Sequence, residues 1–156
     1  MANVGELAPE FTLPDQNGDE VSPGALRPAG LVLYFYPRDD TPGCTTEALE
    51  FSAALADFAA AGVRVFGISR DPLSKHRKFT DKHGLSVPLL SDETGEVCEA
   101  YGVWVEKNMY GRKSMGIERS TFLIDGKGVI RRVWRKVRVA GHVEEVLAAG
   151  RAQETA

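Results

Sequence analysis

The sequence predicts an α/β fold in which helices flank both faces of a mixed central β-sheet. Three observations predict it: apolar runs alternate with helical patterns, several runs lack any polar alternation, and a tight turn joins the last two runs. Unbroken apolar runs are typical of strands buried on both faces, which requires helices on each side of the sheet. No repeat or low-complexity linker divides the chain, so we expect one domain over residues 1–156.

Five segments have the composition of strands. They are LVLYFY (31–36), VRVFGIS (63–69), VPLLS (87–91), STFLID (120–125) and VIRRVW (129–134). The turn formed by Asp125, Gly126, Lys127 and Gly128 joins the last two segments as a hairpin. The chain before the first strand is irregular and has a small turn of its own at Gln16-Asn17-Gly18.

Helical patterns fill the intervals between these strands. Residues 44–61 carry apolar side chains at helical spacing, and the pattern ends at Gly62. A second pattern covers 72–83 and stops at Gly84, and shorter helices are expected at about 94–101 and 141–150. The resulting order is β-α-β-α-β-α-β-β-α, which fits a mixed sheet covered on both faces.

Composition and charge exclude several classes of protein. The net charge of −3 argues against a general nucleic-acid binder, and we interpret the basic run VIRRVWRKVR as a solvated strand at a sheet edge. The N-terminus has no basic segment followed by an apolar run, and no apolar window has the length of a membrane span, so we expect neither secretion nor membrane insertion. Two cysteines are too few for a disulfide framework, so we expect the protein to be located in the reducing cytoplasm.

One of these two cysteines, Cys44, lies where a thiol is chemically useful. The strand LVLYFY ends before Pro37, a loop follows, and a helix begins at about Thr41-Pro42, with threonine as N-cap and proline in the first helical position. Cys44 therefore falls in the first helical turn, beyond the carboxyl end of a strand, where ligands of open α/β sheets bind. Free amide groups and the positive end of the helix dipole stabilise a thiolate there.

Nearby charges in the sequence oppose a thiolate at this position. Within six residues of Cys44 there is one cation, Arg38, and there are four carboxylates: Asp39, Asp40, Glu47 and Glu50. A helix dipole supplies only about 0.3–1 kcal/mol, so a further cation is needed. If STFLID runs antiparallel to LVLYFY, Arg119 at its start lies beside the end of that strand and is the candidate.

Together these residues resemble the active site of the peroxiredoxins. Pro37, Thr41 and Cys44 form the P-x-x-x-T-x-x-C signature of that family, and Arg119 supplies the fourth member of its site. The stretches YFYPRDDTPGCTTEA, LLSDETGEVCEAYGVW and GIERSTFLIDGKGVI resemble the Q-type subgroup, also called bacterioferritin comigratory proteins. The resemblance covers nearly the whole chain and implies a thioredoxin-like fold and thiol-dependent reduction of hydrogen peroxide and organic hydroperoxides.

The resemblance also implies a role for each site residue. Cys44 attacks the peroxide and becomes a sulfenic acid, Thr41 hydrogen-bonds the peroxide, Arg119 holds thiolate and peroxide together, and Pro37 shields the sulfur from water. Taken singly, each residue has an ordinary explanation as well: Thr41 as a helix cap, Pro37 as a strand terminator and Arg119 as a surface residue. Glu47 fits a capping box or the helix N-terminus.

The second thiol is where this chain departs from the subgroup. Many Q-type members have a resolving cysteine five residues after the first one, where this chain has Leu49, and others have it near the segment KFTDKHG, which contains none here. Cys98, the other thiol, has Val97 and Tyr101 around it at helical spacing and is interpreted as a buried core residue, with resolution of the sulfenic acid as the alternative. We therefore expect a one-cysteine cycle.

The expected partners are a hydroperoxide and an external thiol such as thioredoxin, glutaredoxin or a small thiol. We expect no cofactor, no nucleic acid and no membrane partner, and the resemblance to the Q-type subgroup implies a monomer. We expect no metal, because His76, His83 and His142 do not combine with the cysteines in a zinc-binding spacing. Residues 102–116 include Trp104, Met109, Tyr110 and Met115, which are explained by core packing or by an apolar collar over the pocket. Two other functions stay open: a redox sensor that uses Cys44 without turnover, and a thioredoxin-type dithiol oxidoreductase, which is disfavoured because no C-x-x-C is present.

Overall fold

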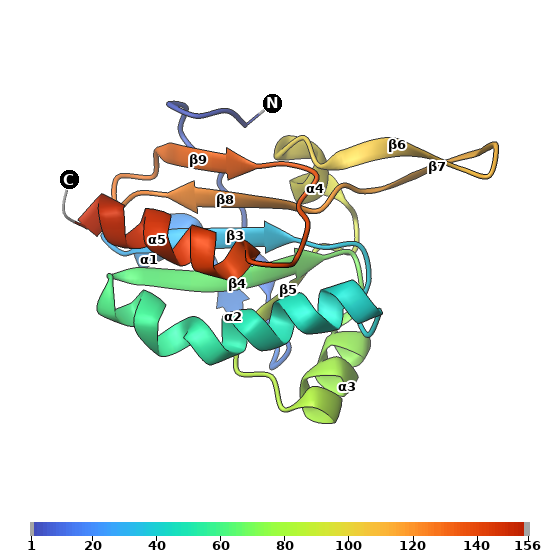
Figure 1. The fold of residues 1–156 in the computed structure, drawn as a ribbon, viewed down its shortest axis with the longest axis horizontal. Helices are drawn as coiled ribbons and strands as arrows, with labels where there is room; N and C mark the ends of the chain where they lie inside the picture. The colour runs from blue at the N-terminus through green and yellow to red at the C-terminus, as the bar shows by residue number, and fades with distance from the viewer. Residues whose placement is uncertain (1, 155–156) are drawn as a thin grey trace.

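The protein is built around a five-stranded mixed sheet (Figure 1). The computed structural model describes residues 2–154, and the strand order is β5-β4-β3-β8-β9. Strands β3, β4 and β5 run parallel, and β8 pairs antiparallel with both β3 and β9. The five strands are β3 (Gly30–Phe35), β4 (Val63–Ser69), β5 (Leu89–Ser91), β8 (Ser120–Ile124) and β9 (Ile130–Trp134). Each predicted strand is therefore confirmed within two residues at either end, and β9 lies at an edge as expected.

Helices cover both faces of this sheet, as predicted (Figure 1). Three helices contribute to the core on one face: α2 (Pro42–Ala60), α3 (Leu73–His83) and α5 (His142–Glu154). The opposite face is covered by α4 (Glu96–Ala100) and by the short α1 (Pro23–Leu26). No helix within residues 2–154 is long and apolar enough to cross a membrane.

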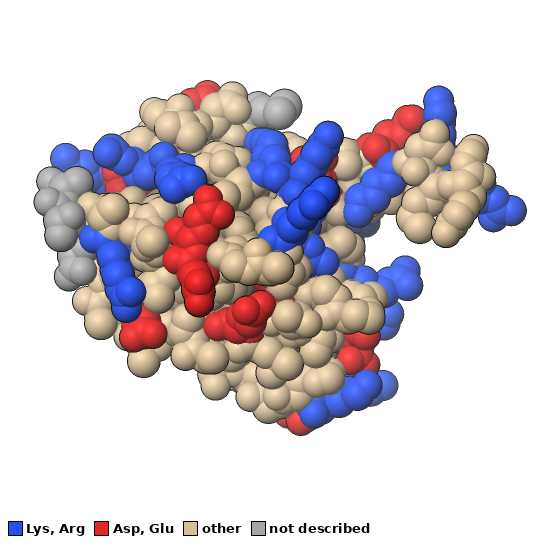
Figure 2. All heavy atoms as spheres, viewed as in Figure 1, with Lys and Arg blue, Asp and Glu red and all other residues tan. Residues whose placement is uncertain are grey.

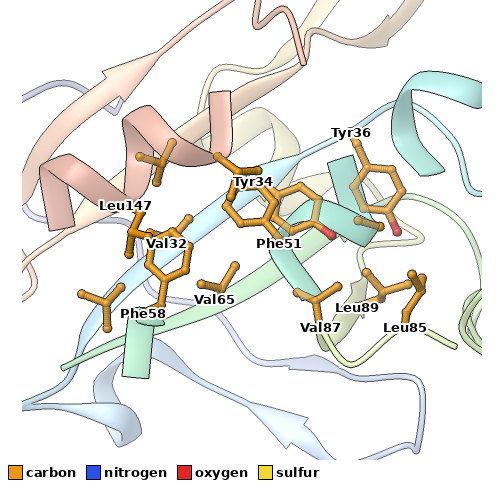
Figure 3. Close-up of a cluster of buried hydrophobic side chains, with 14 of the residues drawn as sticks. Val32, Tyr34, Tyr36, Phe51, Phe58, Val65, Leu85, Val87, Leu89 and Leu147 are labelled. Atoms are coloured by element: carbon orange, nitrogen blue, oxygen red, sulfur yellow. The ribbon is translucent and has the colours of Figure 1, made fainter. Parts of the chain in front are cut away.

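Strand β3 divides the apolar core into two clusters. Val32 and Tyr34 point toward α2 and α5, where they pack with Phe51, Phe58 and Leu147 (Figure 3). Leu31, Leu33 and Phe35 face the other cluster, together with side chains of α4. Every residue of β3 is buried, which explains why its sequence is apolar without alternation.

Five elements were not predicted. The turn at Gln16-Asn17-Gly18 joins two short strands, β1 (Leu13–Pro14) and β2 (Glu20–Val21), and α1 follows them. The larger omission is the antiparallel hairpin of β6 (Trp104–Met109) and β7 (Arg112–Ile117), which projects from the sheet (Figure 1). Its two-residue turn consists of Tyr110 and Gly111, which both have positive φ. Most of the hairpin is exposed, so its sequence lacks the alternation that reveals a half-buried strand.

His142 joins α5 to the sheet and makes stability depend on pH. Its Nε2 lies 2.8 Å from the Thr121 hydroxyl, and burial lowers the pKa of His142 to about 4, from an ordinary value of 6.5. Between these values the unfolded chain binds the extra proton, so His142 lowers the free energy of unfolding by on the order of 3 kcal/mol as pH falls from 6.5 to 4. Glu47, whose pKa is raised to about 7, contributes with the opposite sign, so the His142 contribution is measured as the difference in urea unfolding between the natural protein and His142→Gln across this range. An equally steep dependence in the variant contradicts this assignment.

Candidate active site

The first turn of α2 presents Cys44 at the carboxyl end of β3. The helix begins at Pro42, and Thr41 has the extended backbone of an N-cap (φ −93°, ψ 155°). The Thr41 side chain makes no capping hydrogen bond, however, and its hydroxyl instead donates to the Arg38 carbonyl oxygen at 2.9 Å. The predicted position of Thr41 is therefore correct, but the predicted side-chain cap is not. Cys44 is only 2% exposed.

Arg119 reaches this cysteine from the neighbouring strand. The antiparallel register pairs Phe35 with Ser120, so Arg119 stands beside the residues that follow β3. Its Nη2 donates to the Cys44 sulfur at 3.2 Å. The guanidinium is therefore the further cation near Cys44 that we expected to be needed to stabilise a thiolate.

The same guanidinium holds Glu47, one helical turn after Cys44. Arg119 Nη1 donates to Glu47 Oε1 at 2.5 Å, and Glu47 is completely buried. Burial raises the pKa of Glu47 to about 7, although the guanidinium acts in the opposite direction. Its second oxygen, Oε2, has no hydrogen-bond partner among the described residues. The structure thus gives Glu47 a direct contact with Arg119, which the helix-start interpretation of this residue had missed.

Two other carboxylates near Cys44, Asp39 and Asp40, have partners on α3. Asp39 is buried, with one oxygen 2.6 Å from His76 Nδ1 and the other accepting from the Tyr36 hydroxyl at 2.6 Å. His76 Nε2 faces the Leu90 carbonyl oxygen at 2.9 Å and must donate to it, because a carbonyl oxygen only accepts. The buried contact of Asp39 with His76 connects the loop before α2 to α3.

Asp40, the next residue, makes a second connection to α3 at the surface. Hydrogen bonds from Lys82 and His83, at 2.7 and 2.8 Å, hold the pKa of Asp40 below its usual value. The expectation that four carboxylates oppose a thiolate at Cys44 therefore needs correction. Three of them are compensated by partners distant in sequence, and only Glu50 has no ion pair with a described residue.

Pro37 and Thr41 border a cleft of about 780 Å³. Its opposite wall comes from the β6–β7 hairpin, which contributes Trp104, Met109 and Met115. These three side chains agree with the expected apolar collar, whereas Tyr110 lies at the tip of the hairpin and is fully exposed. The structure thus places Pro37 and Thr41 at the cleft and Cys44 and Arg119 in contact with each other.

Comparison with known proteins identifies the family. Residues 4–133 match the model of the AhpC/TSA family. The chain belongs to this peroxiredoxin family. A putative peroxiredoxin Bcp of Coxiella burnetii is 52% identical over 92% of this chain and 95% of its own length, and peroxiredoxin Bcp of Bacillus subtilis is 44% identical over 92% of each chain. The expected resemblance to Q-type peroxiredoxins is therefore confirmed.

Solved structures of peroxiredoxins support the same conclusion. The bacterioferritin comigratory protein of Xanthomonas campestris, studied for alkyl peroxide reduction, is 46% identical over 92% of both chains, with a TM-score of 0.88. A mutant PrxQ of Xylella fastidiosa is 40% identical over 97% of both chains, with a TM-score of 0.92. These comparisons confirm the predicted thioredoxin-like fold. This peroxiredoxin is an enzyme, a thiol-dependent peroxidase.

The second thiol of this peroxiredoxin lies far from the first in the fold. Cys98 is completely buried in α4 and belongs to the core cluster on one face of the sheet, whereas Cys44 belongs to the cluster on the other face. Burial, followed by the Asp92 carboxylate beside it, raises the pKa of Cys98 far above that of an ordinary thiol. This position therefore disfavours a thiolate, as expected of a core cysteine.

Proposed function

We propose that Cys44 is the peroxidatic residue of this thiol-dependent peroxidase. The single observation that carries the assignment is the 3.2 Å hydrogen bond from Arg119 to the Cys44 sulfur, because it provides the positive charge that favours the thiolate. The thiolate attacks one oxygen of a hydroperoxide, the O–O bond breaks, and Cys44 becomes a sulfenic acid. The second oxygen leaves as water or an alcohol after it takes up a proton.

Thr41 and Pro37 complete the proposed site. The Thr41 hydroxyl donates to the Arg38 carbonyl in the structure, and in the cycle the same proton is available for a peroxide oxygen. Pro37 borders the cleft and limits water near the sulfur. Arg119 stabilises the negative charge that develops on the leaving oxygen, as a fixed donor in a partly buried site does. Hydrogen peroxide and organic hydroperoxides are the proposed substrates.

The proposed cycle uses one cysteine. The sheet separates Cys44 from Cys98, and position 49, five residues after Cys44, is a leucine. An external thiol must therefore reduce the sulfenic acid, and thioredoxin, glutaredoxin and small thiols are the candidate donors. A reducing cytoplasm fits this cycle, because a chain with two cysteines has no disulfide framework. The proposed oligomeric state is a monomer.

Turnover is the experiment that tests this function. Catalytic consumption of hydroperoxide with an added thiol, without disulfide reductase activity, is the expected result. Oxidation of Cys44 that stops after one equivalent of peroxide, however much thiol is added, is the behaviour of a redox sensor and contradicts the proposal. Reduction of an insulin disulfide is the property of a dithiol oxidoreductase and contradicts it as well.

Cys98→Ser tests the one-cysteine cycle directly. The variant should keep turnover with a small thiol as donor, because Cys98 takes no part in the chemistry. It should lose about 1 kcal/mol of unfolding free energy, because a smaller and more polar side chain replaces a completely buried thiol. Steady-state turnover and urea unfolding measure the two effects. Loss of turnover in a variant that is still folded, together with faster overoxidation of Cys44, contradicts the one-cysteine cycle.

A further inference from the structure

The cleft that Pro37 and Thr41 border is positively charged, although the chain as a whole has a net charge of −3. Four cationic residues line it, against two acidic ones, Asp71 and Glu93; the cations are Arg38, Arg70, Lys75 and Lys107. Asp71 is buried, and its carboxylate already accepts hydrogen bonds from Ser69 and from the backbone of Asp39. Figure 2 shows lysine and arginine side chains gathered where the hairpin projects from the body of the molecule.

These four cations are available to a ligand. None of them forms an ion pair with another residue in the described part of the chain. Arg70 is held in place, because its guanidinium lies 4.5 Å from the centre of the Trp104 ring and donates to the Glu93 carbonyl oxygen at 3.1 Å. The cleft thus combines fixed positive charge with the apolar side chains of Met109 and Met115.

The size and position of the cleft fit a small ligand. Cys44 is 2% exposed, and the loop before it is attached to α3 by Asp39 with His76 and by Asp40 with Lys82 and His83. The cleft of about 780 Å³ has the size of a small-molecule site. Pro37 and Thr41 border it, and Thr41 lies directly before the helical turn that carries Cys44.

We propose that the electron donor of this enzyme is a small thiol that carries carboxylates, and that it enters through this cleft. The proposal rests on the one-cysteine cycle described above. The donor thiolate attacks the sulfenic sulfur of Cys44, an S–S bond forms, the S–O bond breaks, and the oxygen leaves as water after protonation. A second donor attacks the mixed disulfide, which releases the Cys44 thiolate and a disulfide of the two donors. Each cycle thus oxidises two donor thiols and reduces one hydroperoxide.

Charge attraction sets the expected specificity. The carboxylates of the donor interact with Lys75 of α3 and Lys107 of β6, which line the cleft. This interaction raises the concentration of donor near the first turn of α2. An uncharged or cationic thiol gains no such advantage. The preference should decrease with ionic strength, because salt screens exposed charges.

The test measures the reduction of the sulfenic acid by itself. One equivalent of hydrogen peroxide oxidises Cys44, and stopped-flow kinetics then follow the loss of the sulfenic acid with glutathione or with its glycyl ethyl ester. The ester lacks one carboxylate at a position remote from the thiol. Glutathione should react about five-fold faster than the ester at low salt.

Charge reversal in the cleft should abolish this preference. In the double variant Lys75→Glu, Lys107→Glu, the rate with glutathione should fall about ten-fold and the ester should become the faster donor. The matched control is Arg77→Glu, Lys113→Glu, which makes the same charge change on the same helix and hairpin but outside the cleft. The control should keep the preference of the natural protein. The rate of oxidation by hydrogen peroxide is measured first for each variant, so a general loss of Cys44 reactivity is detected separately.

Two results overturn the proposal. In the first, the rates are independent of donor charge, or change equally in the cleft variant and the control. In the second, thioredoxin reduces the sulfenic acid faster than glutathione does, at a rate that the cleft variant leaves unchanged. If peroxide yields no sulfenic acid at Cys44, the one-cysteine cycle itself fails, and this is seen before any thiol is added.

Discussion

Cys44→Ser abolishes hydroperoxide reduction and leaves the fold intact. Serine has nearly the same size as cysteine and replaces a side chain that is 2% exposed, so the packing of α2 against the sheet is preserved. The serine hydroxyl stays protonated beside Arg119 and is not a nucleophile toward peroxide. Peroxide consumption with excess thiol measures the loss, and circular dichroism checks the fold.

Cys98→Ser serves as the matched control for this experiment. It makes the same chemical change at the other cysteine, on the opposite face of the sheet, and should retain turnover. Activity near that of the natural protein in Cys44→Ser would remove this residue from the mechanism.

Arg119→Met slows peroxide reduction by about 10²–10³-fold, the usual cost of losing one fixed donor to a developing charge. Methionine keeps much of the apolar stem but removes the charge that contacts both Cys44 and Glu47. The nucleophilicity of the Cys44 sulfur should therefore fall. Alkylation by iodoacetamide at neutral pH should be slower than in the natural protein.

Arg119→Lys separates charge from geometry in the same experiment. Lysine keeps a positive charge but has a single side-chain nitrogen, so it cannot contact Cys44 and Glu47 as the two nitrogens of the planar guanidinium do. The rate of peroxide reduction should therefore lie between those of the natural protein and Arg119→Met. An alkylation rate that is unchanged in Arg119→Met excludes Arg119 from the site.

The sheet and the main helices were predictable because their sequence patterns reflect burial. Strand β3 lies between two core clusters, and its six apolar or small residues report that position directly. The β6–β7 hairpin has no buried face of this kind, and its turn of Tyr110 and Gly111 is not the usual Asn-Gly signal. Local sequence therefore carried little information about the hairpin.

The geometry of the site was predictable only where the topology determines it. Arg119 could be placed near Cys44 because it precedes a strand that pairs antiparallel with β3. The pairing of Asp39 with His76 could not be foreseen, because the two residues are 37 positions apart and meet only when α3 packs beside the loop. For the same reason, counting carboxylates along the sequence overestimated the negative charge that Cys44 experiences.

Peptide mapping after a single equivalent of hydrogen peroxide, with dimedone present to trap sulfenic acid, tests the central claim most directly. A thiolate at Cys44 held by Arg119, and separated by the sheet from Cys98, should give a dimedone adduct on Cys44 and leave Cys98 as a free thiol. A dominant cross-link between Cys44 and Cys98 within one chain contradicts the one-cysteine cycle.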